Sequence, residues 1–182
     1  MRYGMILCVF LALAAPVRAT VLVGADLGEL SRDAIAIARG RVAAVDARWT
    51  PDHRAIETIV TLKVEMYLKG ALGPTLQFRV PGGELGRYSS VFVGAPAFER
   101  DERVIVFLGA RSPSVPYVLG LSQGVFRIVS ARDDVSQPLV TPPAIFPAVA
   151  ETVPIKRGDP QRRPMPLDDF ERRVQALVDG AR

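Results

Sequence analysis

The chain contains a single histidine, His53, which follows Asp52 in a polar turn. A histidine beside a carboxylate could act as a general base, and a hydroxyl such as Ser89 or Ser90 would then have to act as nucleophile. No Gly-x-Ser-x-Gly elbow surrounds either serine. One histidine and one cysteine, Cys8, are too few for a tetrahedral zinc site. A solvated turn residue is therefore the favoured interpretation of His53.

The other polar clusters also lack the spacing that chemistry needs. Acidic residues gather at 99–102, in "FERDERV", which is typical of a charged turn. Asp133 and Asp134 lack the spaced oxygen ligands of a calcium loop. The glycine-rich run 82–86 lacks the Lys-Ser/Thr of a phosphate loop, and the adhesion tripeptide at 157–159 is short enough to recur by chance. We expect no catalytic residues, no cofactor and no metal, and hence no enzymatic activity.

Residues 1–19 have the three parts of a secretory signal peptide. Arg2 provides the positive charge, residues 5–15 form an apolar run, and Val17-Arg18-Ala19 resembles a cleavage site. We expect export to the periplasm or the extracellular space, with a mature chain that begins at Thr20. No second long apolar run follows, so no stable membrane span is expected.

The segment 54–70 alternates between apolar and polar residues, as a half-buried strand does. Its even-numbered residues, such as Leu62, should face a core, and its odd-numbered residues, such as Lys63, should face solvent. A strand of this length favours a small barrel around which the strand bends. The segment 34–50 predicts a preceding strand, with a register slip or bulge at Gly40.

The remaining pattern predicts a mainly β protein. A short helix is expected at 26–34, and further strands at 75–80 (with Leu76, Phe78 and Val80 inward), 91–93, 103–110, 117–121 and 124–129. These form a small OB-like barrel, closed or partly open, within a domain of residues 20–133. A proline-rich connector with little regular structure should occupy 134–165. A C-terminal helix is predicted within 166–182, because apolar residues recur there at helical spacing: Leu167, Phe170, Val174, Leu177 and Val178.

Several of these segments resemble a known family. "ARGRVAAVDARW", the following "LKG" and "TLQFRVPGG" are similar to the strand pattern of netrin-like modules, OB-type barrels that include the tissue inhibitors of metalloproteinases. "VGAPAFERDERVIVFL" and "YVLGLSQGVFRI" resemble a group of secreted bacterial proteins without an established activity. The animal inhibitors chelate the zinc of their target through an N-terminal cysteine. The predicted terminus here is Thr20-Val21, so that mechanism is not carried over.

A secreted, non-catalytic binding module is the function that the sequence favours. The net charge of +4, which falls to about +2 when Arg2 and Arg18 are removed, is small and dispersed, which argues against nucleic acid. We expect a protein partner, with a glycan or a small ligand as alternatives. The candidate binding loop spans 82–98 and presents Arg87, Tyr88, Phe92 and Phe98. At least one of the two phenylalanines is expected to belong to the core instead. A protease-inhibitor-like role, implied by the resemblance, and an enzyme of unrecognised type remain alternatives.

Overall fold

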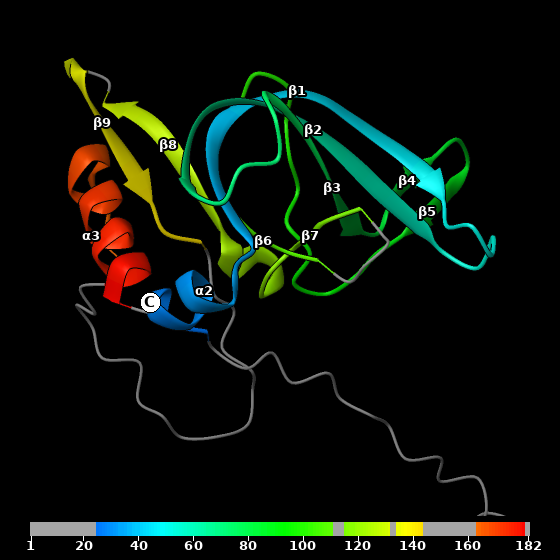
Figure 1. Ribbon diagram of the computed structural model, residues 1–182. Helices are drawn as coiled ribbons and strands as arrows, with labels where there is room; N and C mark the ends of the chain where they lie inside the picture. The colour runs from blue at the N-terminus through cyan, green and yellow to red at the C-terminus, as the bar shows by residue number, and fades with distance from the viewer. Residues whose placement is uncertain (1–24, 111–114, 132–133, 144–162, 181–182) are drawn as a thin grey trace, which may run out of the picture.

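The computed structural model describes residues 25–110, 115–131, 134–143 and 163–180, and Figure 1 shows their arrangement. The protein is mainly β, with one short helix near the start of the described chain and one helix at its end. The elements in chain order are α2 (Leu27–Asp33), β1 (Ala36–Trp49), β2 (Ile56–Lys69), β3 (Thr75–Pro81), β4 (Gly83–Leu85), β5 (Tyr88–Ser90), β6 (Arg103–Gly109), β7 (Tyr117–Val118), the 3₁₀ helix η1 (Leu121–Gly124), β8 (Val125–Ala131), β9 (Asp134–Thr141), β10 (Met165–Pro166) and α3 (Leu167–Gly180).

Strand pairing runs around a ring of β1, β2, β3, β7 and β6. The neighbours are antiparallel except β3 and β7, which are parallel, and β6 returns to pair with the first half of β1. The ring is thinnest between β3 and β7, where the single pair Arg79–Tyr117 joins the strands. This strand order agrees with the expected OB-like barrel, because an OB-fold is a partly open Greek-key barrel of five strands. On the other side of β6 the sheet continues through β8, β9 and β10.

Two hydrophobic cores share the strands β1 and β6. In β6, Val104 and Val106 face the barrel interior, whereas Ile105 and Phe107 face the two helices. The alternation follows from the two-residue period of a strand, which places successive side chains on opposite faces. We call the two sets the barrel core and the helix core. Figure 1 shows α2 and α3 together at one end of the molecule and the β4–β5 hairpin at the other.

The two-faced prediction for β2 is confirmed for its even-numbered residues. Val60 and Leu62 are fully buried in the barrel core, and Leu68 belongs to the helix core, because the long strand passes from one core to the other. The prediction of a solvated odd face is wrong at one end: Glu57 and Ile59 are each only 7% exposed. The residues opposite them on the neighbouring strands account for this burial.

Arg48 lies opposite Glu57 in the β1–β2 register and forms an ion pair with it, at 2.9 Å from Arg48 Nη2 to Glu57 Oε1. Ile59 lies opposite Arg79 of β3, whose aliphatic stem can cover apolar surface. The outer face of β2 is therefore partly covered near the β1–β2 turn, where Arg48 pairs with Glu57.

Gly40 marks the register slip predicted for β1. The pairing of β1 with β2 shifts between Arg39 and Gly40, and again on either side, between Ile37 and Ala38 and between Val42 and Ala44. A Cβ atom at Gly40 would lie 2.3 Å from the Lys63 carbonyl oxygen. A side chain cannot fit there, so glycine permits the close approach that bends the two strands.

Three predicted elements differ from the observed ones. Residues 91–93 form no strand; a turn begins at Phe92 and is closed by a hydrogen bond from the Ala95 amide to the Phe92 carbonyl oxygen (3.0 Å). The predicted strand 117–121 stops at Val118 and continues as a 3₁₀ turn. The predicted connector begins with a regular strand, β9, whose buried Val140 anchors it beneath α3 despite Pro138.

The predicted C-terminal helix is confirmed as α3, and its apolar stripe packs on the helix core. Leu167, Phe170, Val174 and Val178 are buried, and the Phe170 ring centroid lies 4.7 Å from that of Phe126. No helix in the described ranges is long and apolar enough to cross a bilayer. The predicted signal peptide, most of the connector, Asp133 and the tripeptide 157–159 lie outside the described residues.

Candidate functional site

The predicted binding loop begins where β3 reaches the rim of the barrel. Gly82 and Gly83 both have positive φ, at 88° and 141°, which favours glycine. A Cβ atom at Gly83 would lie 2.5 Å from Thr58 Oγ1, and the same hydroxyl donates a hydrogen bond of 2.8 Å to the Gly82 carbonyl oxygen. The two glycines therefore allow the chain to turn back tightly across the end of β2.

A short hairpin forms the first half of the loop. β4 pairs with β5 from Gly83–Ser90 to Leu85–Tyr88, so that Gly86 and Arg87 make a two-residue turn. Gly86 has φ of 60°, as the first position of such a hairpin turn prefers. The turn places Arg87 and Tyr88 at the outer end of the hairpin.

Arg87 and Tyr88 contact each other and continue into an aromatic cluster. Arg87 Nη2 donates a hydrogen bond of 2.9 Å to Tyr88 Oη, and the guanidinium carbon lies 5.0 Å from the Tyr88 ring centroid. The Tyr88 ring meets the Trp49 ring edge-on at 5.4 Å, and the His53 ring stacks on Trp49 at 6.4 Å. We name Trp49, His53, Arg87 and Tyr88 the tip cluster. It joins the β1–β2 turn to the predicted binding loop.

The two predicted phenylalanine anchors have different environments. Phe92 is exposed, whereas Phe98 is half-buried, packs against the barrel core and meets the Phe78 ring edge-on at 5.4 Å. Phe98 thus lies in the loop and also packs against the barrel core. The expectation that one of the pair belongs to the core agrees with this packing.

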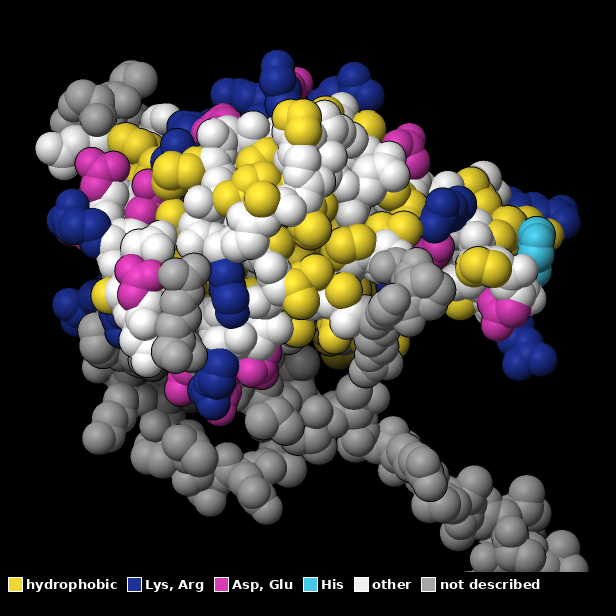
Figure 2. Space-filling model, viewed as in Figure 1, with side chains coloured by type: hydrophobic (Ala, Val, Ile, Leu, Met, Phe, Trp, Pro, Cys, Tyr) yellow, Lys and Arg dark blue, Asp and Glu magenta, His cyan; other side chains and the backbone are white. Residues whose placement is uncertain are grey.

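The segment Val91–Val93 is the most exposed apolar part of the described chain. Val91 is 88% exposed and Val93 79%, with Phe92 between them at 48%. The sequence pattern predicted a strand at 91–93, which the structure does not form because no neighbouring strand of the described chain pairs with it. Hydrophobic side chains gather over the barrel half of the face shown in Figure 2.

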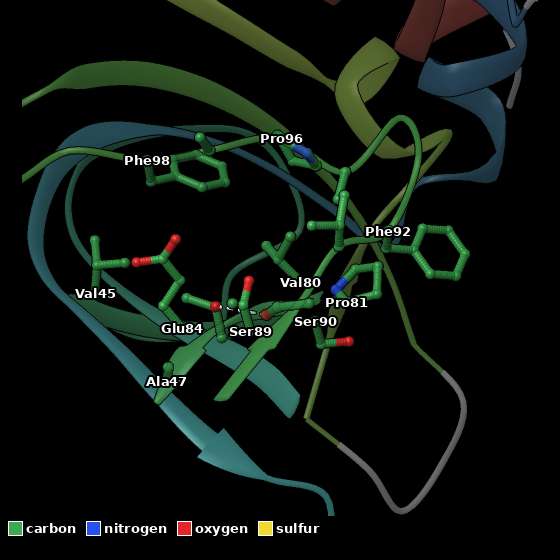
Figure 3. Close-up of a pocket in the computed structure, with 16 residues that line it drawn as sticks. Val45, Ala47, Val80, Pro81, Glu84, Ser89, Ser90, Phe92, Pro96 and Phe98 are labelled. Atoms are coloured by element: carbon green, nitrogen blue, oxygen red, sulfur yellow. Dashed lines mark hydrogen bonds between the residues drawn. The ribbon is translucent and has the colours of Figure 1, made fainter. Parts of the chain in front are cut away.

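A pocket of about 600 Å³ lies beneath the loop, at the end of the barrel (Figure 3). Its sides come from the second half of β1, the ends of β2 and β3, the β4–β5 hairpin and the returning segment 95–98. Most of the lining is apolar. The lining residues are Val45, Ala47, Thr58, Val80, Pro81, Gly82, Gly83, Glu84, Ser89, Ser90, Val91, Phe92, Ala95, Pro96, Ala97 and Phe98.

Glu84 is the only charged residue among those that line the 600 Å³ pocket. Figure 3 shows its carboxylate pointing toward the side of the pocket where Val45 and Phe98 lie. Within the described ranges Glu84 takes part in no ion pair or hydrogen bond of its side chain. The sequence did not single out Glu84, because the pocket exists only once the loop folds over β1 and β2.

A second pocket of about 350 Å³ lies beside the first. The two share a boundary that includes Pro81, Gly82, Phe92 and Pro96. The smaller pocket is also lined by Arg79 and by the buried Glu57, which is already paired with Arg48. The loop therefore stands between two adjacent recesses.

The remaining polar candidates are placed as follows. His53 is exposed in the β1–β2 turn, with φ of 55°, and its ring contact is with Trp49. Ser89 and Ser90 lie on β5 and line the larger pocket. The hydrogen bond from the Thr50 hydroxyl, at 2.6 Å, lowers the pKa of the neighbouring Asp52 carboxyl.

The acidic segment 99–102 forms a tight turn. The Glu102 carboxylate accepts a hydrogen bond from the Glu99 amide (3.1 Å), and Asp101 has φ of 65°. Glu102 is paired with Arg127 at 2.5 Å, so its charge is compensated. No group of three or more His, Cys, Asp or Glu side chains able to hold a metal ion occurs in the described part of the chain.

Comparisons with known proteins add no assignment: no protein-family model, curated protein or solved structure matches this chain.

Proposed function

We propose that the protein is an exported, non-catalytic binding module that holds a protein partner on the loop 82–98. The observation that carries this proposal is the run of exposed apolar side chains at Val91–Val93 beside a mostly apolar pocket. Monomeric proteins rarely leave large side chains of this kind exposed in a contiguous run unless they contact something. Loops fixed on a rigid barrel are also the usual place for recognition.

The tip cluster supports the same proposal. Arginine, tyrosine and tryptophan are the residue types most enriched among interface hot spots. Arg87 and Tyr88 lie at the end of the hairpin, Trp49 lies at the end of β1, and the three side chains are already ordered by their mutual contacts. A pre-ordered group loses little side-chain entropy on binding.

The test is capture of a partner from the native exported fraction. We expect the wild-type protein to retain a partner that a variant with Val91→Ser, Phe92→Ser and Val93→Ser does not retain. Because all three side chains are exposed, the thermal midpoint of the variant should stay close to that of the wild type. Retention of the same partner by this variant would contradict the proposal.

A second pair of variants separates binding from catalysis. Once the partner is purified, Arg87→Ala combined with Tyr88→Ala should weaken binding by at least about 2 kcal/mol, as hot-spot truncations do. His53→Asn tests the enzymatic alternative, since asparagine tolerates the positive φ of this position and keeps a polar side chain. If His53→Asn abolished a measurable activity that the double variant kept, an enzymatic function would replace binding.

A further inference from the structure

Glu84 is a charged residue in surroundings that are otherwise apolar or neutral. The pocket beside it is bounded by Val45, Val80, Pro96 and Phe98, and its other polar groups are hydroxyls and backbone. A partner segment that filled this pocket would remove water from the carboxylate. Since Glu84 has no counter-ion among the described residues, an apolar or acidic segment would leave it buried and unpaired, which is costly.

A cationic group removes that cost. It would supply the missing counter-ion, and a guanidinium or ammonium group donates strong, short hydrogen bonds to a carboxylate. The half-buried ring of Phe98 lines the same space and adds an aromatic surface that attracts cations. The pocket volume of about 600 Å³ is ample for one long side chain and its neighbours.

We infer that the pocket receives a basic side chain, arginine or lysine, of the protein partner, with Glu84 as its counter-ion. This inference rests on the proposed function and specifies the chemistry of the partner. Val91 lines the pocket, Val93 follows two residues later in the chain, and both side chains are largely exposed. They would contact apolar residues that flank the basic one, which a free small cation does not have.

A library of random linear peptides displayed on phage, selected on the immobilised exported protein, tests the inference. The peptides enriched on the wild type should carry an arginine or lysine flanked by apolar residues. Their dissociation constant should rise by about tenfold or more for Glu84→Gln, because a hydrogen-bonded charge pair is lost. Glu84→Arg should abolish binding. The affinity of the wild type should also fall as salt is added, and that of Glu84→Gln much less.

Asp46→Asn is the matched control. Asp46 is an exposed carboxylate on β1, between Val45 and Ala47, but it does not line the pocket. The selected peptides should bind this variant within about twofold of the wild type, the range expected for a surface change outside the contact. Agmatine, the arginine side chain as a free amine, should bind far more weakly than the peptides. Equal affinity for agmatine would mean that the site takes a small cation and would overturn the inference.

The outcomes separate this inference from the proposed function. The inference is overturned if the peptides lack a basic residue, or if they bind Glu84→Gln as tightly as the wild type. The proposed function still stands in either case if Phe92→Ser weakens the binding of these peptides. Peptides insensitive to both Glu84→Gln and Phe92→Ser overturn both. A selection that enriches no peptide also counts against the inference.

Discussion

Glu65 connects three elements through arginine side chains. Its carboxylate lies 2.9 Å from Arg103 Nη2 on β6 and 3.3 Å from Arg39 Nε on β1. Arg39 in turn reaches Glu171 of α3 at 2.5 Å. The hydrogen bond from Arg103, with the charges of Arg103, Arg39 and Arg41, lowers the pKa of Glu65 below its usual value of 4.5, against a smaller opposing effect of burial.

This pKa shift predicts a pH-dependent contribution to stability. A carboxyl whose pKa is lower in the folded state stabilises the fold above its unfolded pKa, here about 4.5, and loses that contribution as the pH falls through the folded pKa. Glu65→Gln should therefore lower the free energy of unfolding at neutral pH and make little difference in strong acid. Because Glu65 is partly exposed, we expect a loss below about 1 kcal/mol.

Urea unfolding of wild type and Glu65→Gln across this pH range checks the prediction. The difference between the two proteins should shrink as the pH falls below 4.5, and at neutral pH it should also shrink in high salt. A difference that stayed constant with pH would mean that the ion pairs of Glu65 contribute nothing.

At the scale of elements, local patterns predicted the strands and helices that have one buried face. Leu62 in β2, Phe78 in β3 and Phe170 in α3 are buried as their periodicity predicted. The strand assigned to 91–93 was wrong, because strand propensity without a partner strand does not make a strand. β9 was not predicted because the proline content of this segment outweighed its apolar residues, of which Val140 is buried.

Paired substitutions in β2 test its two faces. Leu62→Asp would place an unpaired charge in the barrel core and should prevent stable folding. Lys63 is the next residue in the strand and its side chain is exposed. Lys63→Asp should therefore change the free energy of unfolding by no more than about 0.5 kcal/mol. Thermal unfolding followed by circular dichroism measures both variants. Equal midpoints would mean that the assignment of the buried face is mistaken.

At the scale of the whole molecule, the sequence could not predict which segments meet. The parallel contact between Arg79 and Tyr117 joins strands that are far apart in the chain, and no local pattern encodes it. The candidate site has the same origin. Arg87 and Tyr88 were identified by residue type, whereas Glu84 became notable only after β1, β2 and the segment 95–98 were seen around it.

Export is a prediction for the intact protein in its host. The signal-peptide pattern of residues 1–19 predicts that N-terminal sequencing of the exported protein will begin at Thr20. A chain that began at Met1, or well beyond Thr20, would contradict the predicted cleavage site. The processed protein would contain no cysteine, since Cys8 lies within the removed segment, and its midpoint should be insensitive to reducing agents.

The sharing of β1 and β6 between the two cores has a consequence for how the protein opens. Ile105 and Phe107 cover one side of the β6 backbone while Val104 and Val106 cover the other, so water can reach its amides only when both cores separate. The amides in the middle of β6 should then exchange only through global unfolding, and their exchange should be the slowest in the molecule. A chain cut after residue 133 would leave Ile105 and Phe107 uncovered by α3. We therefore expect the shortened chain to unfold at a lower urea concentration than the whole protein.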